Sequence, residues 1–217
     1  MTPEEPAHPA PRGSYEIPEA AILDCGVGNL FSISCALQNV GLDTKIISSS
    51  RGLRNADAIV LPGVGNFKAG SRNLQILRHH IVTLVETGVP LLGVCLGMQL
   101  LFEKSQESLG DGLSLLEGRV LRLPGSVKTP HMGWNTLEVF KPDGILDGVD
   151  GDDHFYFVHS YYADPEDKEV VVAETDYGLS FASVIARDNV YGTQFHPEKS
   201  GRPGELVLRN FAEIVKR

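Results

Sequence analysis

A strand, a tight turn and a helix follow one another within residues 89–102 of this 217-residue chain. Residues 89–92 are the apolar run VPLL, residues 93–99 read GVCLGMQ, and apolar residues then recur at helical spacing. This order predicts that Cys95 lies on a sharp strand-to-helix turn, where the Gly-x-Ser-x-Gly nucleophile elbow carries its serine. Flanking glycines leave room for a strained backbone, and the start of a helix favours thiolate over thiol. A buried structural cysteine is the alternative interpretation, because free cysteine is among the most buried residue types.

Short apolar runs alternate with helical periodicity through the first half of the chain. Strands are predicted at residues 20–23, 44–47, 58–61 and 91–92, and helices at residues 30–40, 74–85 and 98–102. Gly41 is expected to cap the first helix, and Gly88 and Pro90 to stop the second. This alternation predicts an α/β fold with a doubly wound, mostly parallel sheet flanked by helices on both faces.

After about residue 115 the pattern changes to short strands separated by turn residues. These strands are predicted at residues 119–123, 135–140, 154–158, 170–173, 180–185 and 190–195, before an amphipathic C-terminal helix. We expect them to form an antiparallel extension of the sheet. One domain over residues 18–217 is large enough for a substantial core. Residues 1–17 are proline-rich without an apolar segment, so a disordered tail is predicted there rather than a signal peptide.

Composition excludes several function classes. The net charge of −9 argues against non-specific nucleic-acid binding. Three widely spaced cysteines (Cys25, Cys35 and Cys95) without a CxxC pair indicate a reducing compartment, so we expect a cytoplasmic protein. No apolar segment approaches membrane-spanning length, and we expect no membrane partner.

A nucleophilic cysteine needs a base that a third group holds in place. Among seven histidines, His196 ends a predicted strand and is followed two residues later by Glu198. Strand side chains alternate, so both project to the same side, and Glu198 can orient the imidazole toward Cys95. A chance His-x-Glu is common at strand ends, so this pair gains weight only beside the elbow. The order of the three residues disfavours an α/β-hydrolase, in which the acid precedes the histidine.

A glycine-rich segment, residues 62–65 (PGVG), follows the predicted strand at residues 58–61. Gly63 and Gly65 would let the backbone at Val64 approach a substrate or rotate its peptide. Together with the amide of Leu96, this segment predicts an oxyanion hole for acyl transfer. A plain glycine-rich turn is the alternative.

Cofactor motifs are incomplete in this sequence. The glycine pairs at residues 26–28 and 63–65 lack the third glycine of the dinucleotide fingerprint and lead to no P-loop lysine. Neither a zinc-deaminase signature nor a metal-spaced cluster of His, Cys and carboxylates is present. We therefore expect no metal and no organic cofactor.

Taken together, these motifs resemble the class I, triad-type glutamine amidotransferases over almost everything from about residue 20 onward. Within that family the chain is most similar to glutaminase subunits of imidazole glycerol phosphate synthases. Five segments carry this similarity: residues 24–29 (DCGVGN), 95–102 (CLGMQLLF), 131–135 (HMGWN), 157–161 (FVHSY) and 196–200 (HPEKS). Family members that serve other synthases usually have histidine in place of Met98. The family often has tyrosine in place of Cys25, which leaves the triad untouched.

The resemblance implies that glutamine is hydrolysed through a γ-glutamyl thioester. Cys95 would attack the carboxamide carbon, His196 would move the proton, and Glu198 would hold the ring. Gln99 would bind the amino-acid end of glutamine, opposite a wall formed by the neighbouring pair Ser160 and Tyr161.

The resemblance also implies a partner, a (β/α)8-barrel cyclase subunit that receives the ammonia. The cyclase would make imidazole glycerol phosphate and aminoimidazole carboxamide ribotide in histidine biosynthesis. Expected interface residues are Asn29, Trp134, Tyr156 and Lys199. Related glutaminases are nearly silent until the cyclase binds its substrate, which implies a Gly63–Val64 peptide that is misaligned at rest. Two alternatives stay open: an amidotransferase that serves another synthase, such as one acting on chorismate, and a catalytically silent interaction subunit.

Overall fold

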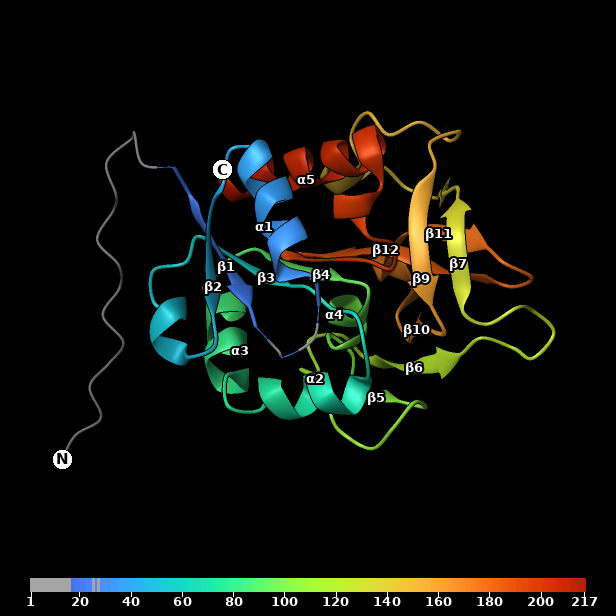
Figure 1. The fold of residues 1–217 in the computed structure, drawn as a ribbon, viewed down its shortest axis with the longest axis horizontal. Helices are drawn as coiled ribbons and strands as arrows, with labels where there is room; N and C mark the ends of the chain where they lie inside the picture. Colours follow the sequence, from blue (N-terminus) through green and yellow to red (C-terminus); the bar gives the residue numbers. More distant parts are fainter. Residues whose placement is uncertain (1–16, 25, 27) are drawn as a thin grey trace.

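A mixed sheet of eight strands forms the centre of the molecule (Figure 1). The computed structural model describes residues 17–24, 26 and 28–217; most of the predicted tail and Cys25 lie outside the described residues. In sheet order the strands are β2 (Asp43–Ile47), β1 (Glu19–Leu23), β3 (Ala58–Leu61), β4 (Leu91–Val94), β13 (Val190–Thr193), β12 (Ser180–Arg187), β11 (Val171–Asp176) and β8 (Glu138–Val139). From β2 to β13 the neighbours are parallel, and from β13 to β8 they are antiparallel. The predicted parallel sheet with an antiparallel extension is confirmed.

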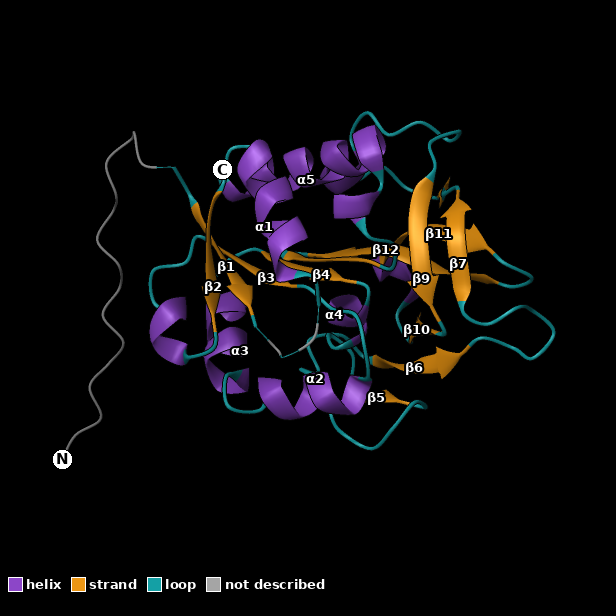
Figure 2. Cartoon of the chain, viewed as in Figure 1, coloured by secondary structure: helices purple, strands orange, loops and turns teal. Residues whose placement is uncertain are grey.

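Helices cover both faces of this sheet (Figure 2). The larger ones are α1 (Leu30–Asn39), α2 (Phe67–Leu74), α3 (Arg78–Glu86) and α5 (Gly201–Val215). Alternate residues of β1 face opposite layers, as strand geometry requires. Ile22 belongs to the core cluster that contains Ile33 of α1 and Phe211 of α5, whereas Leu23 belongs to the cluster with Ile81 of α3. Gly41, with φ +89°, follows the first of these helices.

Shorter elements lie outside the eight-stranded sheet. Beside the main sheet lie β5 (Lys104–Ser105), β6 (Gly118–Arg122) and β10 (Tyr161–Pro165), the antiparallel pair β7 (His131–Asn135) and β9 (Phe155–His159), the helix α4 (Leu96–Gln99), and the 3-10 helices η1 (Ser50–Leu53), η2 (Gly144–Leu146), η3 (Lys168–Val170) and η4 (Pro197–Lys199). Within the described part of the chain, no helix combines the length and the apolar character needed to cross a membrane.

The structure corrects several sequence predictions. The helix predicted at residues 74–85 is α3, which begins only at Arg78, and α2 before it was missed. The inward face of α2 carries Gly70 and Ser71, so its apolar period is hard to read from sequence. The strand predicted at residues 135–140 is instead the end of β7, a connection and the two-residue β8, since pairing partners decide strand limits. The sequence also missed β10, most of β7 and the short β5, and the helix after the cysteine is only four residues long.

Candidate active site

Cys95 is the single residue that connects β4 with α4. Its backbone has φ +53° and ψ −107°, a conformation that non-glycine residues rarely adopt. Packing holds the turn in this shape, because a Cβ on Gly97 would lie 1.8 Å from the carbonyl oxygen of Leu61. The short α4 therefore sits directly against β3, and the cysteine is presented at the carboxyl edge of the sheet.

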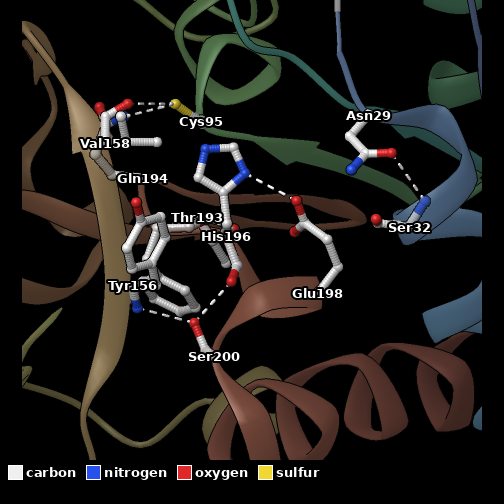
Figure 3. Close-up of polar contacts among 11 residues, drawn as sticks. Asn29, Ser32, Cys95, Tyr156, Val158, Thr193, Gln194, His196, Glu198 and Ser200 are labelled. Carbon is white, nitrogen blue, oxygen red and sulfur yellow. Dashed lines mark hydrogen bonds and ion pairs between the residues drawn. The ribbon is translucent and has the colours of Figure 1, made fainter. Parts of the chain in front are cut away.

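The Cys95 thiol is buried and has two polar contacts (Figure 3). It donates to the carbonyl oxygen of Val158, 3.9 Å from Sγ, and accepts from Nε2 of Gln194 at 3.6 Å. The sulfur therefore lies between a backbone acceptor and a side-chain donor.

The imidazole of His196 lies between Cys95 and Glu198 (Figure 3). Its Nδ1 lies 2.9 Å from Oε1 of Glu198, and both side chains are almost completely buried. The backbone of this segment is held as well, because Ser200 Oγ donates to the His196 carbonyl at 2.7 Å and accepts from the amide of Tyr156 at 3.0 Å. The ring and the carboxylate thus have one defined orientation.

The two neighbours of His196 decide its charge. Burial alone lowers the pKa of His196, but Cys95 and Glu198 together outweigh burial and raise it to about 9. Among the described residues, Nε2 has no hydrogen-bond partner of normal geometry, so its interaction with the sulfur is electrostatic in this arrangement. An imidazolium is favoured here, which suits a group that must give a proton to a leaving amine.

The glycine-rich segment after β3 lies against the elbow. The amide of Leu96 donates to the carbonyl oxygen of Gly63 at 3.3 Å, so this N–H is not available to a substrate. The approach is close, since a Cβ on Gly63 would lie 2.7 Å from Cβ of Leu96. The carbonyl of Gly63 and the N–H of Val64 belong to one peptide and point in opposite directions. A rotation of that peptide would free the Leu96 amide and turn the Val64 amide toward the site.

A cavity of about 260 Å³ opens beside Cys95. Seven residues singled out from sequence line it, namely Val64, Gly65, Cys95, Leu96, Gln99, Ser160 and Tyr161. Sequence reasoning missed Glu107, whose Oε2 accepts from the amide of Phe67 at 2.6 Å. It also missed His159 and Pro130 in the same wall. Nothing in the local sequence around Glu107 distinguishes it from a surface carboxylate, since the fold alone brings it to the cavity.

Both amide hydrogens of Gln99 are used within the protein. Nε2 donates to the carbonyl oxygen of Tyr161 at 2.8 Å and to Oε1 of Gln194 at 3.1 Å. The remaining atom of this side chain, Oε1, can only accept. Gln99 is therefore suited to a hydrogen-bond donor in the cavity, such as an ammonium group.

Two buried histidines support the far wall of the cavity. His159 Nδ1 donates to the carbonyl of Tyr161 at 2.9 Å, so its Nε2 must accept from His131 Nδ1, 3.0 Å away. Burial is the largest influence on both rings and lowers their pKa values, to about 4 for His131 and about 3 for His159. Both rings are neutral at pH 7.

Three of the expected interface residues gather at one surface. Trp134 is 56% exposed and packs edge-on against Tyr156, with ring centroids 5.8 Å apart, and Lys199 Nζ lies 6.0 Å from the same Tyr156 ring. Asn29 caps α1, where its Oδ1 accepts from the amide of Ser32 at 3.2 Å. Within the described residues, no group of three His, Cys, Asp or Glu side chains is arranged to hold a metal ion.

Comparison with known proteins agrees with this site. Residues 21–215 match the family Glutamine amidotransferase class-I. Among solved structures, a chain of PurLQS from Thermotoga maritima superposes with a TM-score of 0.75 and covers 91% of this chain and 99% of its own length, at 20% identity, which shows a common fold. The chain belongs to the class I glutamine amidotransferases.

Within this family, the chain is similar to curated proteins that share one name. Imidazole glycerol phosphate synthase subunit HisH of Methanothermobacter thermautotrophicus is 50% identical over 197 residues, covering 90% of this chain and 98% of the relative. The subunit of the same name from Moorella thermoacetica is 48% identical over 200 residues, covering 90% and 95%. That of Archaeoglobus fulgidus is 49% identical over 199 residues, covering 91% and 99%.

Proposed function

We propose that this chain is the glutaminase subunit of an imidazole glycerol phosphate synthase, acting in histidine biosynthesis, and that Cys95, His196 and Glu198 are its catalytic residues. The class I family and the nearly full-length similarity to subunits of that synthase support the activity. The observation that carries the residue roles is the buried His196–Glu198 pair, whose imidazole lies next to the sulfur of Cys95, a residue that lines the cavity.

The reaction proceeds in two halves. The Cys95 thiolate attacks the carboxamide carbon of glutamine, and the tetrahedral intermediate collapses to a γ-glutamyl thioester as His196 gives its proton to the departing ammonia. Neutral His196 then takes a proton from water, whose oxygen attacks the thioester carbon. Glutamate leaves, and the sulfur regains its negative charge beside an imidazolium. Glu198 holds the Nδ1 hydrogen throughout and so keeps Nε2 facing the sulfur.

The cavity selects glutamine by its amino-acid end. Glu107 is the one carboxylate among the described residues that line the cavity, and Oε1 of Gln99 is a further acceptor. Together these oxygens suit the α-ammonium group. Ser160 and Tyr161 line the same cavity, where the Tyr161 carbonyl accepts from Nε2 of Gln99. A substrate that lacks the ammonium would leave these acceptors unpaired, which costs affinity.

Activity depends on the peptide between Gly63 and Val64. In the described conformation the Gly63 carbonyl occupies the Leu96 amide, so a developing oxyanion would meet one donor fewer. The partner is a (β/α)8-barrel cyclase that contacts the surface of Trp134, Tyr156 and Lys199, and also Asn29. Its binding favours the rotated peptide and it takes up the ammonia directly, to make imidazole glycerol phosphate and aminoimidazole carboxamide ribotide.

The test uses the complex of this chain with the cyclase of the same source. Glutamate formation is measured with and without the cyclase's nucleotide substrate. We expect strong stimulation by the nucleotide and a loss of at least about 10³-fold in Cys95→Ala, while synthesis from added ammonia continues. Unchanged glutamine turnover in Cys95→Ala would refute the mechanism.

Two further assays separate the alternatives. A glutamine-mimicking diazo-ketone should label Cys95 in the complex, and an absence of labelling would favour a silent interaction subunit. Ammonia-dependent product formation with a chorismate-utilising synthase, instead of the cyclase, would favour an amidotransferase of another pathway.

A further inference from the structure

We propose that Gln194 is a further catalytic residue, whose side-chain amide holds the Cys95 sulfur and connects it with Gln99 in the substrate cavity. Gln194 lies between the end of β13 and His196 and is completely buried. Its Nε2 lies 3.6 Å from Sγ of Cys95, and its Oε1 lies 3.1 Å from Nε2 of Gln99. The inference rests on the proposed function, because it assigns a role within the same site.

A backbone carbonyl sets the orientation of both amides. The Tyr161 carbonyl can only accept, so the atom of Gln99 that lies 2.8 Å from it must be nitrogen. The second hydrogen of that nitrogen points to Gln194, whose nearer atom must therefore be oxygen. The atom of Gln194 that remains for the sulfur is its nitrogen, a donor. A reversed Gln194 would instead place an oxygen lone pair against the sulfur.

A donor at this position favours the anionic nucleophile. A thiolate accepts a hydrogen bond from N–H more strongly than a neutral thiol does, because the acceptor is charged. The contact lies in the protein interior, since Cys95 is 5% exposed and Gln194 is 0% exposed. The backbone of Gln194 is anchored too, because its N–H donates to the Ser183 carbonyl at 2.9 Å.

Few other groups face the sulfur. The titratable group next to the sulfur is His196, after β13, while His159, at the end of β9, and Glu107, in the loop after β5, line the same cavity. Val158 contributes an uncharged carbonyl. The neutral side chain that donates to Sγ is that of Gln194. Its Oε1 accepts from Gln99, which lines the substrate cavity.

Alkylation of Cys95 measures this role without any glutamine. The full chain in complex with its cyclase is treated with iodoacetamide between pH 5 and 10, and the modification of Cys95 is followed by peptide mass spectrometry. The variants are Gln194→Met, Gln194→Glu and Gln99→Met. The matched control is Ser183→Ala, which removes the buried hydrogen bond from Ser183 Oγ to Thr175 Oγ1 in the neighbouring strand.

We expect Gln194→Met to raise the pH midpoint of alkylation by about one unit, which makes the reaction about tenfold slower at pH values below both midpoints. Gln194→Glu should have the larger effect, because it keeps the acceptor for Gln99 but places a carboxylate against the sulfur. Gln99→Met should also raise the midpoint and slow the alkylation by about threefold, although the Gln99 side chain does not touch the sulfur. In glutamine hydrolysis, Gln194→Met should lower kcat with little change in KM, whereas Gln99→Met should also raise KM.

The outcomes are distinguishable. If folded Gln194 variants keep the wild-type midpoint, as Ser183→Ala should, the role of Gln194 is overturned. If Gln99→Met alone has no effect, the link to the substrate cavity is overturned. If Gln194→Met does not fold, Gln194→Glu and Gln99→Met still decide. Failure of the wild-type complex to hydrolyse glutamine would instead contradict the proposed function, and the alkylation result would stand apart from it.

Discussion

The two sides of the Cys95 site differ in how completely they are assembled. On one side, His196 and Glu198 already form a buried pair with an Nδ1–Oε1 distance of 2.9 Å. On the other side, the Leu96 amide is occupied by the Gly63 carbonyl at 3.3 Å. The His196–Glu198 pair is already assembled, whereas the proposed oxyanion hole is not.

The difference follows from what holds each side. The His196 segment is fixed by core packing and by Ser200, so moving it would break several buried hydrogen bonds. The Gly63 carbonyl is held to the elbow by one long hydrogen bond, and Gly63 has no side chain. Contacts with a partner could repay the loss of one such bond, which contributes about 0.5–1.5 kcal/mol net. A switch is therefore easier to place in the glycine segment than in the triad.

The largest expected effect comes from breaking the assembled side. Glu198→Gln removes the carboxylate that holds the imidazole, and we expect kcat for glutamine to fall by about 10²–10⁴-fold in the stimulated complex. Steady-state glutamate formation measures it. Glu205→Gln is the matched control, because it removes the same charge on the exposed surface of α5. Equal activities of the two variants would show that the pair is structural.

A smaller effect is expected from the glycine segment. Gly63→Ala places a Cβ 2.7 Å from Leu96 and 2.9 Å from the amide of Gly97, so the segment must move away from the elbow. We expect stimulated kcat to fall by about 10²-fold, the order of one lost oxyanion donor, while unstimulated turnover changes much less. Gly125→Ala, which meets no atom within 4 Å, is the control. A proportional loss with and without nucleotide would argue against a rotating peptide.

The smallest effect is expected from His131 and His159, which support the cavity wall. It tests whether this wall is held as firmly as the His196 side of the site. The folded pKa values of His131 (about 4) and His159 (about 3) lie below the ordinary value of 6.5. The unfolded chain therefore takes up more protons as the pH falls, and the stability from these rings, complete above pH 6.5, is lost toward pH 4. We expect Tm to fall by about 4–8 °C between pH 7 and 5, measured by calorimetry.

His131→Phe keeps a ring in the stack but removes one titrating group, so its Tm should decline less steeply with falling pH. His79→Gln, at an exposed position of α3, serves as the control and should follow the wild type. His196 acts with the opposite sign. Its pKa of about 9 means that its contribution is complete below pH 6.5 and is lost as the pH rises toward 9. A Tm that is flat from pH 5 to 7 would contradict the assignment of neutral buried rings.

Local signals were enough for much of the fold. The apolar runs of β1, β3 and β4 and the glycines around Cys95 are contiguous in sequence, so the parallel sheet and the turn were predictable. The spacing of His196 and Glu198 is local too. The errors fell where a partner element decides the outcome, as for α2 with its inward Gly70, and for β8, which pairs two residues with β11.

The amino-acid sequence by itself determined which chemical groups this protein owns and the backbone turns that expose them, because strand period, helix period and glycine placement act over a few residues. Only the tertiary structure decided which groups meet. Gln194 reaches Cys95 across 99 positions, Glu107 reaches the amide of Phe67 across 40, and the Gly63 carbonyl reaches the Leu96 amide. The physical reason is that a hydrogen bond depends on distance and direction in space, and those are properties of the packed chain.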